Sequence, residues 1–504
     1  MKKEAALPII LIAILIFSQV SFALSINGMK LKEVRLSPDK TPSNKIINTR
    51  PSSHNVTSSK ISDINIFNEN AKSQRISEIK KSGKIETISG TLIQITYDDF
   101  ENSRSITQYV IQTSDKTVYN IYSTDNSIEN LAGSEITIEG YTQGNEIVPS
   151  RLSTLSSSLR KQTKTLNEQK LIILLVNWAD DNSTPLTIKQ TYNLTFNLNN
   201  PNSLSYYINE VSYGRASLTG DVYGWVTSDY NKSKMCTTER FAIINNAIAK
   251  ADSFVDFSKY QHLMIISSTN TGCTSSGGSY PWAFNTNEGQ VKLTLSQISN
   301  FQYLGSGADI HEFGHQLGLL HANGWECGSA TIGNNCQSIN YGDSLDIMGY
   351  YPGHTHFNAF HKEKLGWINS REIKTISSPG SYTITPLETP GGLKMLKIPT
   401  NSGITYSIEF RRPILLDKIM INYFGSQIYS GAIIHSNYTN LNLGYDTQLL
   451  DNKPHAGDIS FYDFADSALD VNQKFQDITN NIEIKTISFI DENLTVCIGP
   501  INFC

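Results

Sequence analysis

The chain has 504 residues, of which 39% are hydrophobic and 17% are charged, as is usual for globular proteins. At roughly 150 residues per domain this length predicts about three units, because one hydrophobic core rarely serves so long a chain. The formal charge of -5 and the pI near 6.1 give no basic field for phosphates, so nucleic acid is not expected as a partner.

Residues 1–23 have the pattern of a secretory signal peptide. Lys2 and Lys3 precede an apolar run from Ala5 to Phe17, and small residues up to Ala23 form a plausible cleavage site. The alternative is an uncleaved membrane anchor, which is disfavoured because the apolar run is shorter than the ~20 residues that a span needs. We therefore expect a secreted protein, extracellular or in the cell envelope, without stable membrane insertion after signal removal.

Residues 24–82 are rich in Ser, Asn and Lys with little apolar periodicity, so we expect a flexible leader. Residues 83–155 change to short β-rich runs at 90–97, 106–112, 117–122 and 135–141, separated by polar turns. These runs predict a small β-barrel of the oligonucleotide/oligosaccharide-binding (OB) type. Residues 156–168 are polar and are expected to form a linker.

A new domain is expected over residues 169–370, because 171–178 is a continuous apolar run of buried-strand length. Apolar residues at helical spacing follow over 204–211, with Gly214 placed to end the helix. Further runs predict a strand at 216–226, a helix through 241–248, and strands at 263–266 and 291–295. This order predicts a mixed, twisted sheet with helices on its faces.

After residue 370 the helical signals fade and alternating apolar runs predict a C-terminal antiparallel β-sandwich over 371–504. The whole chain is thus predicted to be an α+β multidomain protein. Six cysteines in an exported chain are expected to pair, although sequence alone leaves the connectivity open. Proximity favours three pairs: Cys236 with Cys273, Cys327 with Cys336, and Cys497 with Cys504.

One segment contains several residues that could bind a metal ion or transfer a proton. It reads His311-Glu-Phe-Gly-His-Gln-Leu-Gly-Leu-Leu-His321. His311 and His315 are four residues apart and lie on one face of a helix, where both can bind one ion. Catalytic zinc takes three protein ligands and a water, whose pKa it lowers towards ~7. Glu312 stands beside the pair, placed to accept that water's proton as general base. The alternative for the helical pair alone is a solvated or core-facing pair without metal.

The third ligand is predicted at His321, because Gly318 can adopt the backbone conformation that ends the helix and returns the chain to the metal. The chain has 33 glycines and 10 histidines, so both residues meet these offsets by chance only roughly once in 800. The spacing therefore favours a three-histidine zinc site.

Downstream, Tyr341-Gly-Asp-Ser-Leu-Asp-Ile-Met-Gly-Tyr350 places a methionine in a tight polar loop. Met348 is predicted to be a soft apolar floor beneath the imidazoles and not a ligand. Tyr350 is a candidate to reach the metal or an oxyanion, and a packed or exposed tyrosine is the alternative.

These segments resemble the gametolysin-type zinc metallopeptidases of the metzincin clan. The residues that carry the resemblance are HEFGHQLGLLHA from His311, YGDSLDIMG from Tyr341, FNAFHKEKLGW from Phe357 and YGRASLTGDVYGW from Tyr213, with a weaker extension over 408–413. The resemblance implies a zinc-dependent endopeptidase that acts on extracellular or cell-wall polypeptides, with residues 83–155 as a pro-segment. Some metzincins are kept latent by a thiol, but the first cysteine here is Cys236, inside the predicted catalytic domain. Latency must then come from another ligand or from steric cover.

Two further features leave alternatives open. His354, His356 and His361 are candidates for a second metal site, although a loop pair of this kind is more often a pocket wall or solvated. Residues 275–281 are expected to form a flexible loop before the strand at 291–295. That strand is expected to lie along the cleft, where an extended substrate could add by main-chain hydrogen bonds.

Two rival functions remain at this point. A surface adhesin with structural zinc is one, but Glu312 is intact and no fourth protein ligand stands at zinc spacing. A zinc hydrolase that acts on a non-peptide amide is the other, and the sequence around His354 does not decide against it.

Overall fold

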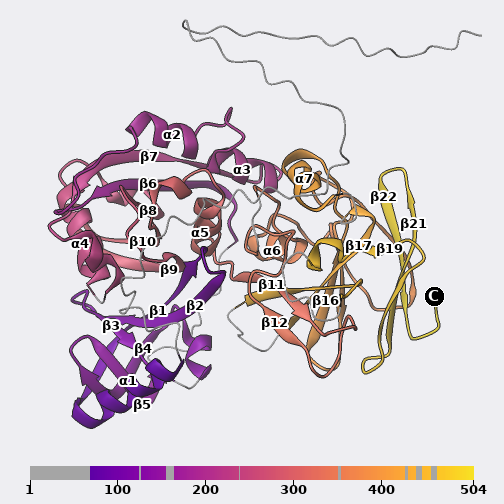
Figure 1. The fold of residues 1–504 in the computed structure, drawn as a ribbon, viewed down its shortest axis with the longest axis horizontal. Coiled ribbons are helices and arrows are strands. Elements are labelled where there is room, and N and C mark those ends of the chain that lie inside the picture. The colour runs from indigo at the N-terminus through magenta and orange to yellow at the C-terminus, as the bar shows by residue number, and fades with distance from the viewer. Residues whose placement is uncertain are drawn as a thin grey trace, which may run out of the picture. The chain divides into compact units, whose positions relative to one another are not determined.

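The structure is a computed structural model that describes residues 69–123, 126–154, 164–237, 239–349, 353–425, 429–438, 445–455 and 463–504. These residues belong to one compact unit that starts at residue 60, and they form a mixed α+β protein with three sheets (Figure 1). The predicted signal peptide, most of the predicted leader and Tyr350 lie outside the described residues. None of the described helices is long and apolar enough to cross a membrane.

Five N-terminal strands pair in a closed ring. They are β1 (Lys84–Asp99), β2 (Arg104–Gln112), β3 (Val118–Ile121), β4 (Glu135–Gln143) and β5 (Glu146–Thr154). β1 pairs antiparallel with β2 and β4, β2 pairs with β3, β4 pairs with β5, and β3 closes the ring by a parallel pairing with β5. Buried isoleucines and Leu92 fill this unit. The four predicted strands are present, and β5 is an addition that the sequence left unmarked because Pro149 interrupts its pattern.

The segment Glu69–Ser82 differs from the predicted flexible leader, since it forms the 14-residue helix α1. Its single buried apolar side chain is Ile79, and α1 contacts β4 and β5. Arg75 donates a hydrogen bond from Nε to the Glu146 carboxylate of β5 at 3.0 Å. One apolar anchor and one ion pair hold this helix, and neither produces a periodic pattern in the sequence.

The central sheet has the order β9-β10-β8-β6-β7, formed by β6 (Asn167–Asn177), β7 (Ala216–Thr227), β8 (His262–Ser267), β9 (Ser275–Thr286) and β10 (Gly289–Ile298). β9 runs antiparallel to β10, and the other neighbouring strands are parallel. Alternate residues of β6 face opposite cores. Ile172 and Leu174 pack with α4 (Arg240–Ala251), whereas Leu171 and Ile173 pack with α3 (Leu204–Val211) and α5 (Ala308–Gln316). The helix α2 (Ile188–Thr195) contacts β7.

Two expectations for this region were wrong. Residues 275–281 are the start of strand β9 and not a flexible loop, and the strand at 291–295 is β10, which lies inside the sheet between β9 and β8. The edge of the central sheet is therefore β9. The side of β9 that faces away from β10 pairs with the end of β1 through Thr96↔Gly277, Tyr97↔Ser276 and Asp98↔Ser275. This pairing joins the N-terminal ring to the central sheet.

The C-terminal part is built from two further sheets. One has the order β12-β11-β18-β17-β16-β15-β13 with β19 beside β17, and the other has the order β14-β22-β21-β20. Leu396 and Ile434 of the first sheet share a core with Leu494 and Val496 of the second, as a β-sandwich requires. The bounds are β11 (His321–Glu326), β12 (Gln337–Ile339), α6 (Ala359–Leu365), β13 (Ile373–Thr375), β14 (Gly380–Ile384), β15 (Met395–Pro399), β16 (Ile404–Glu409), α7 (Met420–Phe424), β17 (Gly431–Tyr438), β18 (Tyr445–Leu450), β19 (Leu469–Asp470), β20 (Lys474–Asp477), β21 (Ile482–Ile490) and β22 (Asn493–Gly499).

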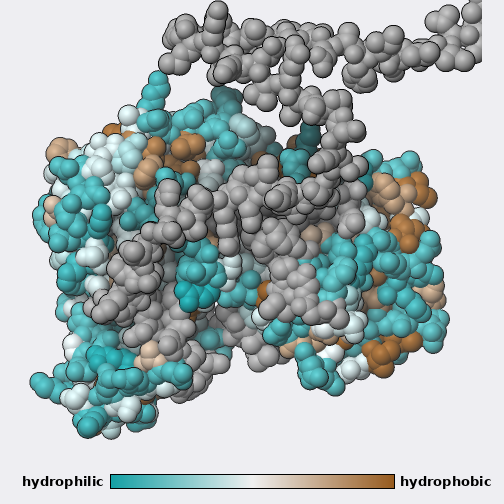
Figure 2. All heavy atoms as spheres, viewed as in Figure 1, coloured by the Kyte–Doolittle hydropathy of each residue, from teal (hydrophilic) through white to brown (hydrophobic). Residues whose placement is uncertain are grey.

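The predicted cysteine pairs all form. Cys236 is bonded to Cys273, Cys327 to Cys336, and Cys497 to Cys504. The face drawn in Figure 2 is mainly hydrophilic, and hydrophobic side chains gather at the side where Figure 1 labels β21 and β22. In β21, Phe489 is 39% exposed and Ile490 is 64% exposed.

Candidate metal centre

The helix α5 presents two of the predicted ligands. His311 and His315 lie one turn apart on α5, and their ring centroids are 4.9 Å from each other. The helix ends at Gln316, and Gly318, two residues further on, has φ +97°, so the chain turns back there as the glycine predicted. His321 then opens β11 with its ring 4.9 Å from His315 and 5.2 Å from His311. The structure thus brings the three predicted histidines together, and all three are buried.

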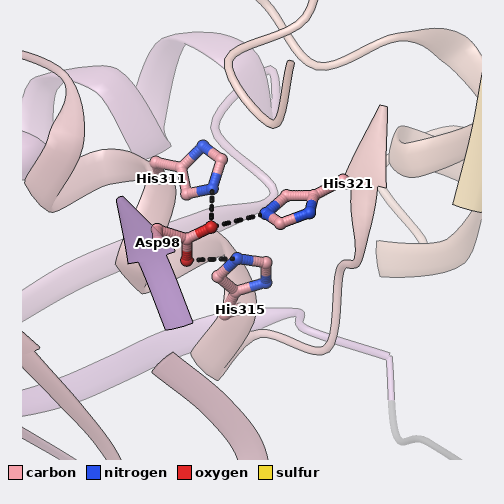
Figure 3. Close-up of side chains that lie close together, drawn as sticks. All are labelled: Asp98, His311, His315 and His321. Carbon is pink, nitrogen blue, oxygen red and sulfur yellow. Dashed lines mark ion pairs between the residues drawn. The ribbon is translucent and has the colours of Figure 1, made fainter. Parts of the chain in front are cut away.

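A fourth residue that the sequence did not indicate joins them (Figure 3). Asp98, at the end of β1, points its carboxylate between the three rings. Oδ1 of Asp98 is 2.9 Å from Nε2 of His321 and 3.8 Å from Nε2 of His311, and Oδ2 is 3.3 Å from Nε2 of His315. The four ligand atoms lie within 4.8 Å of one another.

These residues fit a tetrahedral metal ion. Bonds of ~2.0–2.1 Å to nitrogen and oxygen place the ligand atoms of tetrahedral zinc about 3.3 Å apart. The separations of 2.9, 3.3 and 3.8 Å between Asp98 and the three imidazoles lie on both sides of this value. The buried Nε2 atoms of His315 and His321 face Asp98 and have no other hydrogen-bond partner among the described residues. Burial lowers the pKa of His311 and His321, which keeps these imidazoles neutral, as metal ligands must be.

Each imidazole is also held from its far side. Nδ1 of His311 bonds the carbonyl of Ile347 at 2.8 Å, and Nδ1 of His315 bonds the carbonyl of Leu319 at 2.8 Å. A carbonyl can only accept, so both Nδ1 atoms carry the proton and both Nε2 lone pairs point to the centre. Nδ1 of His321 lies 3.1 Å from Oγ of Ser105, which comes from β2 of the N-terminal ring.

Glu312 lies beside the ligands on α5 and is fully buried. Neither of its carboxylate oxygens has a hydrogen-bond partner among the described residues. Burial, with a further contribution from the Asp98 carboxylate, raises the pKa of Glu312 well above its usual range. A carboxyl group with a raised pKa and no committed partner is suited to accept and release a proton near neutral pH.

The strand β9 is pressed against this part of α5. A Cβ on Gly277 would lie 2.6 Å from the carbonyl oxygen of Glu312, 2.8 Å from Cβ of His315 and 3.0 Å from a carboxylate oxygen of Glu312. Glycine at this position is what allows the sheet edge to run directly alongside the metal-binding helix.

Met348 packs against α5 between the two helical histidines. It is fully buried, and a Cβ on Gly314, between the two helical histidines, would lie 2.4 Å from its Sδ. The loop that carries it is held by Asp346, which accepts from the backbone N–H groups of Met348 and Asn358, both at 2.7 Å. The buried Arg411 donates to the carbonyl of Leu345 at 3.0 Å, so a residue of the C-terminal part also supports this loop.

The tyrosine next to the centre is Tyr341. Its hydroxyl donates to Oδ1 of Asp98, and its ring centroid is 4.7 Å from that of His321. The candidate named from the sequence, Tyr350, lies outside the described residues. Tyr341 stands within a segment that the resemblance already marked, but nothing local distinguished it from a packed tyrosine.

The second histidine cluster does not assemble. Nδ1 of His361 bonds Asp346 at 2.7 Å, whereas Nε2 of His356 lies 3.2 Å from Glu210. Among the described residues, the Asp98 group is the one set of three or more His, Cys, Asp or Glu side chains close enough to share an ion. His354, His356 and His361 therefore serve as structural side chains.

A scan against protein-family models and a search of the curated proteins both find no match to the chain. The three imidazoles and the Asp98 carboxylate form a donor set that can hold a metal ion, and the buried Glu312 carboxyl lies beside it with no hydrogen-bond partner among the described residues.

Proposed function

We propose that the protein is a zinc-dependent endopeptidase of the metzincin type that hydrolyses internal peptide bonds of extracellular or cell-wall proteins. The observation that carries the proposal is the relation of Glu312 to His311 and His315 on one helix. The two histidines share an ion site with His321, and the adjacent carboxyl is buried with no partner of its own among the described residues. A structural metal site has no use for such a group.

His311, His315 and His321 would hold the zinc through Nε2. When bound, zinc polarises a carbonyl and lowers the pKa of a coordinated water towards ~7. Glu312 then accepts the proton of the attacking water, and its raised pKa allows it to pass that proton to the leaving amine. Met348 and the Asp346 loop keep the imidazoles in place during these steps.

Several features support the wider assignment. Three imidazole nitrogens among the four ligand groups favour zinc over magnesium or calcium, which prefer oxygen ligands. Three disulfides support folding in an oxidising compartment and thus export. The closed ring of β1 to β5 supports an OB-like barrel as the pro-segment, and the mixed sheet with an antiparallel edge supports a metzincin-like catalytic domain.

The test uses the full chain, assayed on unfolded casein before and after limited digestion with immobilised trypsin. We expect one equivalent of zinc by elemental analysis in the wild type, in Glu312→Ala and in Glu288→Ala, an exposed control between β9 and β10. Casein turnover should fall about 10²–10⁴-fold in Glu312→Ala alone, because a general base is lost. Chelation should abolish turnover in the wild type, and added zinc should restore it.

A zinc-loaded, folded wild type that cleaves no casein in either form would overturn the proposal. The adhesin reading or a non-peptide amide substrate would then take its place.

A further inference from the structure

We propose that the protein carries its own inhibitor, in which Asp98 is a fourth metal ligand and the end of β1 fills the substrate edge of β9. The inference rests on the proposed function, because it describes how the same metal centre is kept inactive. Two independent sets of contacts carry it, one at the metal and one along the sheet.

The first set concerns charge. Asp98 is 1% exposed, and one of its carboxylate oxygens has no hydrogen-bond partner among the described residues. A buried carboxylate is costly unless a cation or hydrogen bonds compensate it. The atoms that face it include Nε2 of His311, His315 and His321, and one ion could be shared by all four ligand atoms. A divalent ion held by these three nitrogens would compensate the carboxylate and draw it into its coordination shell.

The consequence for catalysis follows from ligand number. A catalytic zinc keeps one position open for water, whereas a structural zinc has four protein ligands. Asp98 and the three histidines surround one ion site (Figure 3), so a bound zinc would have four protein ligands and no open position. Glu312 would then have no metal-bound water to deprotonate.

The second set concerns the main chain. β9 is the edge of the central sheet, and extended peptides commonly bind such an edge by adding a strand. The edge beside the metal is already taken, because Thr96, Tyr97 and Asp98 pair antiparallel with Gly277, Ser276 and Ser275. The close approach of Gly277 to Glu312 places this stretch of β9 directly alongside the metal-binding helix. A substrate and β1 would therefore compete for one site.

Side chains around Asp98 hold the inhibitory segment down. Phe100 packs edge-on against His311 with ring centroids 5.3 Å apart, and the guanidinium of Arg240 lies 4.7 Å from the ring centre of Tyr97. Oγ of Ser105 reaches His321. The segment thus touches two of the three metal-binding histidines through residues other than Asp98, which orients the carboxylate without help from the metal.

The experiment compares the full chain as wild type, Asp98→Asn, Asp98→Ala and Asp99→Ala. Asp99 is the matched control, because it is the neighbouring aspartate but pairs with the exposed Arg104 at 2.7 Å. Asp98→Asn keeps the side-chain volume and guards against a packing defect. Each variant is also made with Glu312→Ala, so that the metal centre can be examined without turnover.

Two measurements are made. The Glu312→Ala forms are loaded with Co²⁺ and titrated with acetohydroxamate, a small chelator that needs an open position on the metal. We expect saturable changes in the visible spectrum for both Asp98 variants, and none for the wild type or Asp99→Ala. In the forms with Glu312, casein turnover before any digestion should rise at least about 10²-fold in the Asp98 variants, since a buried charge pair is broken.

The outcomes separate the two proposals. Hydroxamate binding that opens in the Asp98 variants without casein cleavage would support self-inhibition and overturn the peptidase assignment. Casein cleavage and hydroxamate binding that are equal in the wild type and the Asp98 variants would overturn self-inhibition and leave the peptidase assignment intact.

Discussion

The hydroxyl of Tyr341 donates a hydrogen bond to Oδ1 of Asp98, the oxygen that also lies 2.9 Å from Nε2 of His321. Under the self-inhibition proposal Asp98 takes the open metal position. If a substrate carbonyl binds there once Asp98 has left, the same hydroxyl is aimed at the oxygen that gains negative charge during hydrolysis. A donor fixed in that position stabilises the transition state more than the bound substrate.

We therefore expect Tyr341→Phe to lower turnover without loosening the metal. Introduced into the Asp98→Ala chain, it should reduce kcat on a peptide substrate by about 10²-fold, in line with the loss of one oxyanion donor. Zinc affinity, measured by competition with a chromophoric chelator, should stay the same. Tyr303→Phe is the control, because its hydroxyl bonds Glu101 and not Asp98. An unchanged kcat in Tyr341→Phe would remove this residue from the mechanism.

The turn at Gly318 yields a second prediction. Its φ of +97° is unfavourable for any residue with a Cβ, so Gly318→Ala should shift His321 and weaken the site. A strain of about 1–2 kcal/mol corresponds to a roughly 5- to 30-fold loss of zinc affinity. Gly328→Ala carries similar backbone strain at φ +75° in open space, away from the metal. Equal zinc affinities for the two variants would show that the turn does not position His321.

Gly277 and Gly278 are adjacent in β9 but should respond in opposite ways. A Cβ on Gly278 would lie 2.7 Å from the carbonyl oxygen of Gln94 in β1, whereas one on Gly277 would meet Glu312 and His315. In the full chain, Gly278→Ala should push β1 away and raise casein turnover about 10-fold. Gly277→Ala should not raise it, and should lower turnover in the Asp98→Ala chain. A gain from Gly277→Ala would contradict this assignment of the two sides.

The pair of His361 and Asp346 predicts a pH-dependent stability. Burial alone would lower the pKa of His361, but the Asp346 and Asp446 carboxylates outweigh it and raise the pKa to about 9. Because the pKa is higher in the folded protein than its usual 6.5, the stabilisation is fully present below about pH 6.5. It is lost as the pH rises through about 9, and it amounts to roughly 3 kcal/mol at most.

The measurement is Tm against pH for the wild type and His361→Gln. The Tm difference should be largest near pH 6 and small near pH 10. His455→Gln is the control, since that side chain is 65% exposed and its ion pair with Asp463 is screened by solvent. A Tm difference that is constant across this range would show that His361 is not charged in the folded protein.

Local spacing explains which parts of the centre could be predicted. His311 and His315 are four residues apart, and Gly318 and His321 follow within a dozen residues of the first histidine. The arrangement of the three imidazoles therefore depends on local backbone geometry, which the sequence spacing predicts. Met348 could be predicted only because it follows that motif.

Asp98 could not be predicted, for a different reason. Tyr97-Asp98-Asp99-Phe100 offers two equivalent aspartates, and only the pairing of β1 with β9 turns Asp98 rather than Asp99 towards the metal. The search for zinc ligands at short spacing also missed it, since the ligand comes from another part of the chain. The resemblance implied only that latency would have to come from a ligand other than a thiol or from steric cover.

The wrong expectation for residues 275–281 has a related cause. Gly277 and Gly278 lower the β-propensity of this segment, so the sequence favours a loop. In the structure both positions need glycine, because α5 approaches Gly277 closely and β1 approaches Gly278 closely. Glycine pairs in a strand mark close contact that only the assembled fold reveals.

The strand that begins at His321 ties the metal centre to the C-terminal half of the chain. β11 pairs in parallel with β18, and Asp446 of β18 accepts from the backbone N–H of Leu320 at 2.8 Å. A protein shortened at residue 370 would therefore lose the neighbour that fixes its third histidine. The C-terminal residues after 370 could therefore not be replaced by another domain unless that domain also supplied the contacts that β18 makes beside His321.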